Sequence, residues 1–271
     1  MGAKADGAVR APEFWHDSRF PQLESRRSCR RNSCYRPHTH ERFAIGLIDE
    51  GSSVFVGRSG APVPLGVGDV VLIPAGHVHS CNPVEGEWTY QMMLIEPQWL
   101  RTHVWSGRSG FESAIQVYRA GDARRVFDDA NSALFARPSG LEEFTVLLRR
   151  AFDALGGAEV QHAEAVGATF LGDSLRPVLE VLAEQPDDPR LDDLAAAAGM
   201  DRYQLIRAVK KATGLTPIAW RNNARVIRAR AMLRGGEPIA SVAHALGFAD
   251  QSHLHRVFRA HVASTPGEYI R

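Results

Sequence analysis

The feature that most constrains this fold is an internal repeat in roughly the last eighty residues, with a period of 48–49 positions. Each copy runs through apolar residues, a glycine, an acidic residue, a mixed apolar and basic stretch, and Thr-Pro followed by an aromatic residue. The first copy comprises Leu191, Leu194, Ala195, Gly199, Met200, Asp201, Leu205, Arg207, Val209, Lys210, Thr216, Pro217 and Trp220. The second comprises Ile239, Val242, Ala243, Gly247, Phe248, Asp250, Leu254, Arg256, Phe258, Arg259, Thr265, Pro266 and Tyr269. Agreement at so many positions predicts one supersecondary unit present twice.

Each copy predicts a helix-turn-helix unit, over residues 191–212 and 239–261. A short apolar helix ends at Gly199 or Gly247, because glycine takes the left-handed conformation that a sharp exit requires. The second helix turns its apolar residues inward and its arginine and lysine side chains outward. A helix of this length fits the major groove, and a long helix over 217–233 would place the two units in successive grooves. A helical bundle with a duplicated hairpin is the alternative, but it does not require basic outer faces on both second helices.

Basic residues are concentrated in the same segment. Between positions 199 and 271, twelve Lys and Arg stand against four Asp and Glu, whereas the whole chain has a net charge of +1. A basic block on a nearly neutral protein suits a module that binds phosphates, although a basic face can also be merely solvated.

The block from about residue 175 to residue 271 strongly resembles the DNA-binding domain of the AraC/XylS family. The resemblance rests on GMDRYQLIR at 199–207, GFADQSHLHRVFR at 247–259 and TPGEYIR at 265–271. It implies base or backbone contacts with DNA from both second helices. The residues concerned are Arg202, Tyr203, Ile206 and Arg207 in the first, and Gln251, Ser252, His253, His255 and Arg256 in the second. The outward-facing Lys210 and Arg259 are expected to contact phosphates.

Two positions depart from the family pattern. Val209 stands where the family usually carries phenylalanine, which is expected to loosen the packing beneath the first unit. Ala249 stands where serine is usual, which is expected to remove a helix cap worth about 1 kcal/mol.

The front half of the chain has a sequence pattern typical of β-strands. Between residues 34 and 97, short apolar runs alternate with turns rich in Gly, Pro and Asn, a pattern that predicts a sandwich or barrel. His38-Thr39-His40 and, about thirty residues later, GDVVLIPAGHVH at 68–79 resemble the cupin motifs, and Asn82 follows near its expected place. In the AraC/XylS family, such a domain commonly precedes the DNA-binding block and binds the effector.

The expected fold class is α+β, with an N-terminal cupin-like β-barrel and trailing helices followed by an all-α domain of two helix-turn-helix units. We expect a flexible arm over residues 1–28 and a sensing domain over 29–110. A helical dimerisation and linker region follows over 111–172, and the DNA-binding domain over 173–271. Residues 141–155 carry an apolar stripe, which predicts either the seam of a homodimer or a surface packed against the barrel.

Candidate effector-binding residues lie at the expected mouth of the barrel and on a neighbouring strand. They are His38, His40, His79, Trp88 and Tyr90. The two aromatic residues have a simpler alternative, because an aromatic side chain on a strand often belongs to the core.

The three histidines are also candidate metal ligands, since imidazole suits zinc, nickel and iron, and Cys34 or Cys81 could assist. The acidic ligand of a catalytic cupin is missing, because Ala44 and Ile45 occupy its place and Glu41 would face away from its neighbour His40. Three interpretations remain open. The histidines contact an effector or maintain the fold without a metal, they form a metal sensor, or they serve metal-dependent catalysis.

Cys29, Cys34 and Cys81 form no CxxC pair, which favours reduced thiols. No apolar stretch reaches membrane-spanning length and the N-terminal residues lack a signal-peptide pattern, so we expect a cytoplasmic protein without membrane association. The predicted function is sequence-specific transcriptional regulation without enzymatic activity, with activation favoured by the resemblance. The expected partners are double-stranded DNA, a small-molecule effector, a second copy of the chain and RNA polymerase, and no cofactor is required. The alternative is a metal-dependent cupin enzyme or metal sensor with an appended helical domain.

Overall fold

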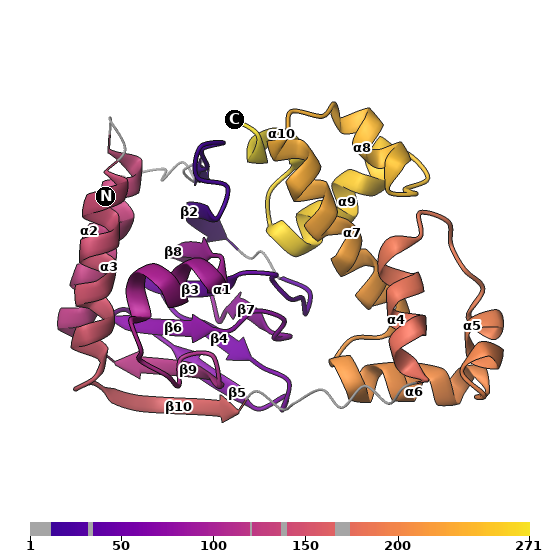
Figure 1. Cartoon of the computed structure of the whole chain (residues 1–271), viewed down its shortest axis with the longest axis horizontal. Coiled ribbons are helices and arrows are strands. Elements are labelled where there is room, and N and C mark those ends of the chain that lie inside the picture. Colours follow the sequence, from indigo (N-terminus) through magenta and orange to yellow (C-terminus); the bar gives the residue numbers. More distant parts are fainter. Residues whose placement is uncertain (1–11, 32–34, 120, 137–139, 166–173) are drawn as a thin grey trace, which may run out of the picture.

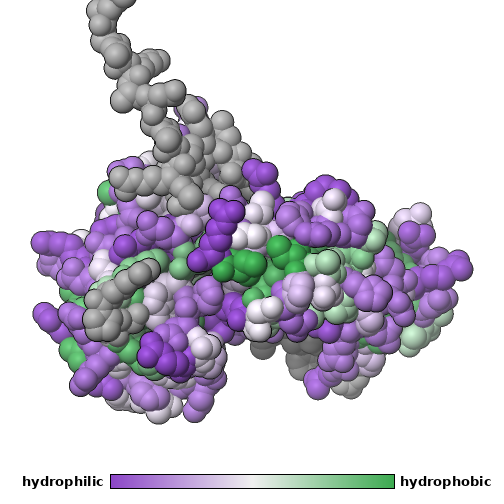
Figure 2. All heavy atoms as spheres, turned by 90° about the horizontal axis from the view of Figure 1, so that it is seen from above, coloured by the Kyte–Doolittle hydropathy of each residue, from purple (hydrophilic) through white to green (hydrophobic). Residues whose placement is uncertain are grey.

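The computed structural model of the chain describes residues 12–31, 35–119, 121–136, 140–165 and 174–271. Two antiparallel sheets and the helices α2 (Gly121–Phe135) and α3 (Leu141–Leu155) form one part, and helices alone form the second (Figure 1). The predicted α+β class and the order of its two halves are therefore confirmed. Viewed from above, apolar residues gather between the two lobes, whereas the outer surfaces are mainly hydrophilic (Figure 2).

The larger sheet has seven strands in the order β1-β2-β8-β3-β6-β9-β10, and the smaller has three in the order β5-β4-β7. The strands of the larger sheet are β1 (Glu13–Trp15), β2 (Leu23–Arg31), β3 (Phe43–Glu50), β6 (Asp69–Ile73), β8 (Glu87–Ile95), β9 (Ala114–Arg119) and β10 (Glu159–Ala165). Those of the smaller sheet are β4 (Ser53–Val56), β5 (Pro62–Leu65) and β7 (Ser80–Pro83). Between β8 and β9 lie the short helix α1 (Pro97–Leu100) and the π-helical turn η1 (Arg101–Trp105).

The central strands supply two cores, because successive strand residues point to opposite faces of a sheet. Phe43 and Ile45 of β3 pack into one core together with Phe152 of α3. Ala44, which lies between them, belongs to a second core that includes Phe55 of the smaller sheet. The larger sheet is therefore covered by helices on one face and by the smaller sheet on the other.

The apolar stripe over residues 141–155 is used largely within the chain. Phe144, Leu148 and Phe152 are buried in the core between α3 and the sheet, whereas Val146 is exposed. Of the two interpretations of this stripe, packing against the barrel domain accounts for these buried residues.

Two segment predictions differ from the structure. The described part of the expected arm over 1–28 contains β1 and most of β2. Strand β1 pairs with β2, and β2 pairs with β8. The region 111–172 is not wholly helical, because β9 and β10 add two strands to the larger sheet. The sequence of β2 does not show the usual alternation of apolar and polar residues. Its alternate residues Glu24, Arg26 and Ser28 are polar, although they are buried. The strands of the barrel domain thus extend over residues 13–165.

The C-terminal domain contains seven helices among the described residues 174–271. They are α4 (Leu175–Glu184), α5 (Leu191–Ala197), α6 (Arg202–Thr213), α7 (Pro217–Arg234), α8 (Ile239–Ala245), α9 (Gln251–Val262) and α10 (Pro266–Tyr269). The pairs α5–α6 and α8–α9 form the two helix-turn-helix units, with boundaries within a few residues of those expected. Val209 is fully buried in the core of the first unit.

Capping residues explain where the second helices of the two units begin. Asp201 accepts a hydrogen bond from the backbone N–H of Gln204, and Asp250 accepts one from that of His253 at 2.6 Å. The expectation that Ala249 leaves the second unit without a cap is therefore wrong, because the next residue, Asp250, supplies it. Gly247 has a φ of +69°, and a Cβ there would lie 1.7 Å from the carbonyl oxygen of Pro186. Only glycine fits this turn.

Among the described residues, no helix is both long enough and apolar enough to cross a lipid bilayer.

Candidate functional site

The second helix of each unit presents a polar, basic face to solvent. On α6 the exposed residues include Arg202, Tyr203, Arg207 and Lys210, whereas Ile206 is partly buried. On α9 they include Gln251, Ser252, Arg256 and Arg259. Within the described part of the chain, the guanidinium groups of Arg207 and Arg256 have no hydrogen-bond or ion-pair partner. Both are therefore free to meet a ligand outside the protein.

Two expected DNA contacts on α9 are less accessible than the others. His253 is half-buried, its ring lies edge-on to Phe248, and its Nδ1 accepts a hydrogen bond from the backbone N–H of Ala249. His255 is also half-buried. The more accessible face of α9 is the one that carries Gln251, Ser252 and the two arginines.

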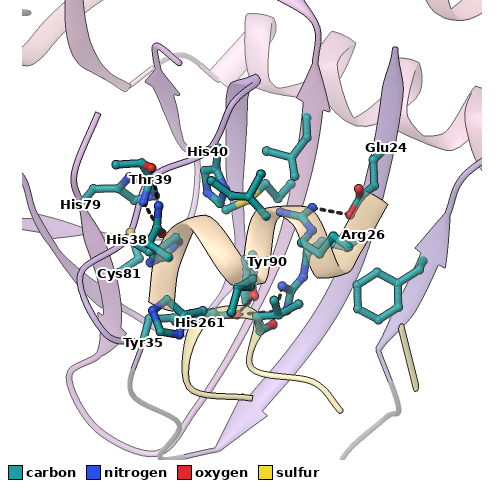
Figure 3. A pocket seen from close by; sticks show the side chains of 18 of the residues that line it. Glu24, Arg26, Tyr35, His38, Thr39, His40, His79, Cys81, Tyr90 and His261 are labelled. Atoms are coloured by element: carbon teal, nitrogen blue, oxygen red, sulfur yellow. Dashed lines mark hydrogen bonds and ion pairs between the residues drawn. The ribbon is translucent and has the colours of Figure 1, made fainter. Parts of the chain in front are cut away.

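A cavity lies between the barrel and α7, the helix that joins the two units (Figure 3). Counted out to its open side, it contains about 620 Å³ of space that no protein atom fills. The barrel side of its wall includes all five predicted effector-binding residues, namely His38, His40, His79, Trp88 and Tyr90. The opposite side comes from α7 and the end of α9. The sequence thus identified one wall of this cavity and missed the other.

His38, His40 and His79 face one another at one end of the cavity (Figure 3). Their ring centroids are 4.6–5.0 Å apart, and each histidine is buried. Burial lowers the pKa of all three imidazoles, to about 4 for His79, and the neighbouring imidazoles lower the pKa of His38 and His40 further. The cluster is therefore uncharged at neutral pH.

Aromatic and sulfur-containing side chains line the wall beside the histidines. The rings of Trp88 and Tyr90 stack with centroids 4.3 Å apart, and the Tyr90 hydroxyl hydrogen-bonds to that of Tyr35. Cys81 also lines the cavity, and burial raises the pKa of its thiol to about 12. Cys34 lies outside the described residues.

Arg26 is a cavity residue that sequence reasoning missed. Its side chain is only 7% exposed. It donates hydrogen bonds to the Ser28 hydroxyl, to the Tyr35 hydroxyl at 3.0 Å and to the carbonyl oxygen of Val262 at 2.8 Å. Within the described part of the chain, no carboxylate forms an ion pair with it. The signal available in the sequence was the polar alternation of Glu24, Arg26 and Ser28.

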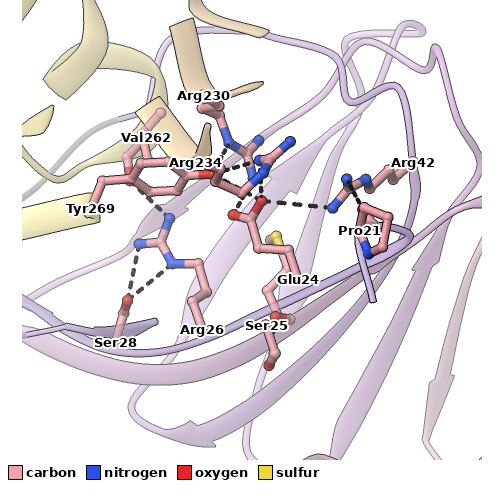
Figure 4. Close-up of polar contacts among 11 residues, drawn as sticks. Pro21, Glu24, Ser25, Arg26, Ser28, Arg42, Arg230, Arg234, Val262 and Tyr269 are labelled. Carbon is pink, nitrogen blue, oxygen red and sulfur yellow. Dashed lines mark hydrogen bonds and ion pairs between the residues drawn. The ribbon is translucent and has the colours of Figure 1, made fainter. Parts of the chain in front are cut away.

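Glu24 is the centre of an ion cluster that joins β2 to the C-terminal domain (Figure 4). Its carboxylate, 3% exposed, pairs with Arg230 and with Arg234 at 2.7 Å, lies 3.8 Å from Arg42, and accepts a hydrogen bond from the Tyr269 hydroxyl. Burial alone would raise the pKa of Glu24, but the three guanidinium groups lower it from 4.5 to about 2. The carboxylate is therefore ionised at any physiological pH.

Further hydrogen bonds tie the barrel to the joining helix. The backbone N–H of Thr39 donates to Oδ1 of Asn223 at 3.0 Å, and Nδ2 of Asn223 donates to the Thr39 hydroxyl at 2.7 Å. Asn223 is buried at this contact. Thr39, which lies between His38 and His40 in the sequence, is thus hydrogen-bonded directly to α7.

The barrel also contacts the C-terminal ends of both second helices. Arg58 donates to the carbonyl oxygen of Lys211 in α6 at 2.6 Å. The backbone N–H of Arg36 donates to the carbonyl oxygen of Ala260 in α9 at 3.1 Å. Together with the bonds to α7, these contacts connect the barrel to both helix-turn-helix units.

Comparisons with known proteins agree with this architecture. A family profile described as an AraC-like ligand binding domain matches residues 20–165, and one described as a helix-turn-helix domain matches residues 194–271. The chain is 23% identical to the arabinose operon regulatory protein of Escherichia coli, over 86% of this chain and 82% of that protein. It is 25% identical to the HTH-type transcriptional activator RhaS of Pectobacterium atrosepticum, over 84% and 85% of the two chains.

Solved structures share the two-domain fold. The crystal structure of ToxT from Vibrio cholerae O395 matches with a TM-score of 0.59 at 13% identity, covering 92% of this chain and 97% of ToxT. ToxT with a bound unsaturated fatty acid matches with a TM-score of 0.53 at 14% identity, covering 92% and 94%. At these identities the similarity concerns the fold alone.

Proposed function

This chain belongs to the family of AraC-type transcription regulators, and on that premise we propose how it meets DNA and what it senses. The exposed faces of α6 and α9 enter two successive major grooves on one side of a duplex. An organic anion in the cavity between the barrel and α7 changes the affinity of that contact. The regulator acts as an activator that binds as a homodimer in the cytoplasm and contacts RNA polymerase. RhaS, a relative over most of the chain, is named an activator.

The observation that carries the DNA contact is the pair of exposed guanidinium groups at corresponding positions of α6 and α9. An arginine that no protein group satisfies can donate two hydrogen bonds to the O6 and N7 atoms of guanine. Arg207 and Arg256 occupy this position in the two units, and Lys210 and Arg259 lie one turn further along each helix. The first pair suits base recognition, and the second suits the phosphates that flank the groove.

The observation that favours an anionic effector is the excess of positive charge beside the cavity. Three guanidinium groups, those of Arg42, Arg230 and Arg234, surround the carboxylate of Glu24. A fourth, that of Arg26, also lines the cavity but forms no ion pair with a described carboxylate. Arg26 is hydrogen-bonded only to uncharged groups, and a buried charge without a counter-charge is costly, so an anion that reaches it gains a strong charge-assisted hydrogen bond. The stacked aromatic rings in the same wall suit an apolar or aromatic body. A carboxylic acid combines the two, as does the fatty acid found in ToxT.

The coupling between effector and DNA follows from where the cavity lies. An effector that contacts both the barrel and α7 changes the relative stability of arrangements in which these two parts contact each other differently. Since the barrel also holds the ends of α6 and α9, such a shift alters the spacing of the two units on DNA. The change in DNA affinity equals the difference in the effector's affinity for the two arrangements.

The experiment is a thermal-shift screen of the full chain with fatty and aromatic carboxylic acids, each paired with its neutral primary amide. We expect certain acids, but not their amides, to raise the melting temperature and to change operator affinity. The variant Arg26→Gln should lose both responses. Arg27→Gln is the matched control, because Arg27 lies next in β2 but contacts Ser132 and Phe135 of α2 on the other face. Equal responses of the two variants, or equal responses to acids and amides, would refute the anionic effector.

A further inference from the structure

The histidine cluster has a feature that effector contacts alone do not explain. Potential ligand nitrogens of His38, His40 and His79 all lie within 4.8 Å of one another. Backbone hydrogen bonds fix the cluster, since His38 and His79 exchange two N–H to C=O bonds of 2.9–3.0 Å and Gly76 donates to the carbonyl oxygen of His40. Three imidazoles from two separate segments are thus held close together, with tilted or edge-on rings, in a buried position.

Hydrogen bonding sets the tautomer of two of the three rings. The Nδ1 atom of His38 lies 2.8 Å from the carbonyl oxygen of Arg36, and that of His79 lies 3.0 Å from the carbonyl oxygen of His77. A carbonyl oxygen can only accept, so each Nδ1 carries the proton and each Nε2 has a free lone pair. This arrangement orients imidazoles in metal sites, where the second ring nitrogen donates to a carbonyl or carboxylate.

The remaining nitrogens are left without partners. The Nε2 atoms of His40 and His79 are buried and make no hydrogen bond with any described residue. A buried polar atom without a partner costs roughly 1–3 kcal/mol, and native structures contain few of them. One nitrogen of each ring lies within 4.8 Å of the others, so a cation placed among the three rings would give such atoms a partner.

We propose that His38, His40 and His79 bind one divalent transition-metal ion, with Zn²⁺ as the best-suited ion and one coordination position open to the cavity. Three neutral imidazoles are a common protein donor set for zinc. Tetrahedral geometry with Zn–N bonds of about 2.0–2.1 Å needs nitrogens roughly 3.3–3.4 Å apart, so modest ring movements within the cluster complete the site. The nearby guanidinium groups of Arg26 and Arg230 favour an anionic fourth ligand, such as hydroxide or a carboxylate.

The metal site is placed to act on the contact between the domains. Thr39 lies between two of the ligands and is hydrogen-bonded through both its backbone and its hydroxyl group to Asn223 of α7. An ion that holds His38 and His40 also restrains Thr39, and therefore stabilises the arrangement in which the barrel holds α7. The inference rests on the cluster itself and remains valid if the effector is not an anion.

The test is calorimetric titration of chelator-treated full-length protein with ZnCl₂, followed by Co²⁺ absorption spectroscopy. We expect one Zn²⁺ per chain, visible cobalt bands typical of low coordination number, and a rise in melting temperature with zinc. His40→Asn and His79→Asn should each weaken zinc binding by at least about 100-fold, since loss of a supporting group alone costs 10–100-fold. His77→Asn is the matched control, because His77 is similarly buried and two positions from a ligand but outside the cluster.

X-ray absorption of the zinc-loaded wild-type protein keeps the test decisive even where a variant fails to fold. We expect a first shell of nitrogen and oxygen with the outer scattering of three imidazoles. Absence of zinc binding by the wild-type protein, binding that survives in His40→Asn and His79→Asn, or sulfur in the first shell would each overturn the proposal. None of these measurements uses DNA or an organic acid, so failure here is distinguishable from failure of the proposed function.

Discussion

Replacing Glu24 by glutamine is expected to lower the free energy of unfolding at pH 7 by about 3–5 kcal/mol, the cost of breaking a buried ion pair from one side. The substitution keeps the shape of the side chain but leaves Arg230 and Arg234, both largely buried, without their carboxylate. Because these arginines belong to α7, the loss falls on the contact between the two domains. Scanning calorimetry should therefore resolve two unfolding transitions in the variant where the wild-type protein shows coupled unfolding.

The dependence on pH gives a second readout of the same cluster. The pKa of Glu24 is lowered from 4.5 to about 2, so its contribution is fully present above about pH 4.5 and is lost as the pH falls towards 2. The stability difference between wild type and Glu24→Gln should be constant from pH 7 to about pH 5 and disappear towards pH 2. Asp122→Asn is the control, because Asp122 pairs with Arg125 in full solvent exposure. A Glu24→Gln protein as stable as Asp122→Asn would show that the ion cluster does not hold the domains together.

Replacing Arg256 by alanine is expected to weaken binding to the specific operator by about 1–3 kcal/mol, which is roughly 5- to 150-fold, and to relax selectivity at one base position. The reason is that Arg256 is exposed on α9, and no described residue satisfies its guanidinium group. The measurement is a set of fluorescence-anisotropy titrations against the operator and against duplexes substituted at single positions.

Lys210→Ala and Arg125→Ala separate base recognition from general charge effects. Lys210 is exposed towards the end of α6. Its loss should weaken binding to DNA of every sequence about equally, and should reduce the slope of log affinity against log salt concentration by about one unit. Arg125 is an exposed arginine of α2 in the barrel domain, and its loss should leave DNA binding unchanged. If Arg256→Ala behaves like either of these variants, Arg256 does not read a base.

The sequence predicted the C-terminal domain well because its signals are local. Gly199 and Gly247 both have positive φ values, 68° and 69°, and Asp201 and Asp250 both cap the helices that follow. Helix ends depend on such neighbouring residues, so their positions can be deduced without knowledge of tertiary contacts. Because the unit occurs twice, each helix end predicted in one copy could be compared with the corresponding position in the other.

The polar parts of the barrel domain could not be predicted in the same way. Strand β2 contains two buried charged residues that each have a partner more than 200 positions away, namely Arg230 for Glu24 and Val262 for Arg26. Richness in Arg and Pro therefore suggested a flexible arm over residues 1–28, although β2 lies inside the sheet. The prediction that Ala249 removes a helix cap was wrong because α9 begins after Asp250, one residue later, and Asp250 caps it.

Some cavity residues could be predicted from local sequence motifs, whereas others depend on contacts between distant parts of the chain. The cupin motifs identified His38, His40 and His79, because their spacing along the chain reflects neighbouring strands. Asn223 and Arg26 carry no motif. The docking of α7 on the barrel brings Asn223 to the cavity, and the pairing of β2 with β8 brings Arg26 there. Sequence reasoning therefore identified part of the barrel wall of the cavity and missed Arg26 and the wall that α7 forms.

The central claim is that one chain places two recognition helices in successive major grooves, and selection of bound duplexes from a random pool by the full-length protein tests it most directly. We expect the selected sequences to share two short conserved blocks whose centres lie about 10–10.5 base pairs apart, one helical turn. Enrichment of one block only, or of two blocks at variable spacing, would contradict the account.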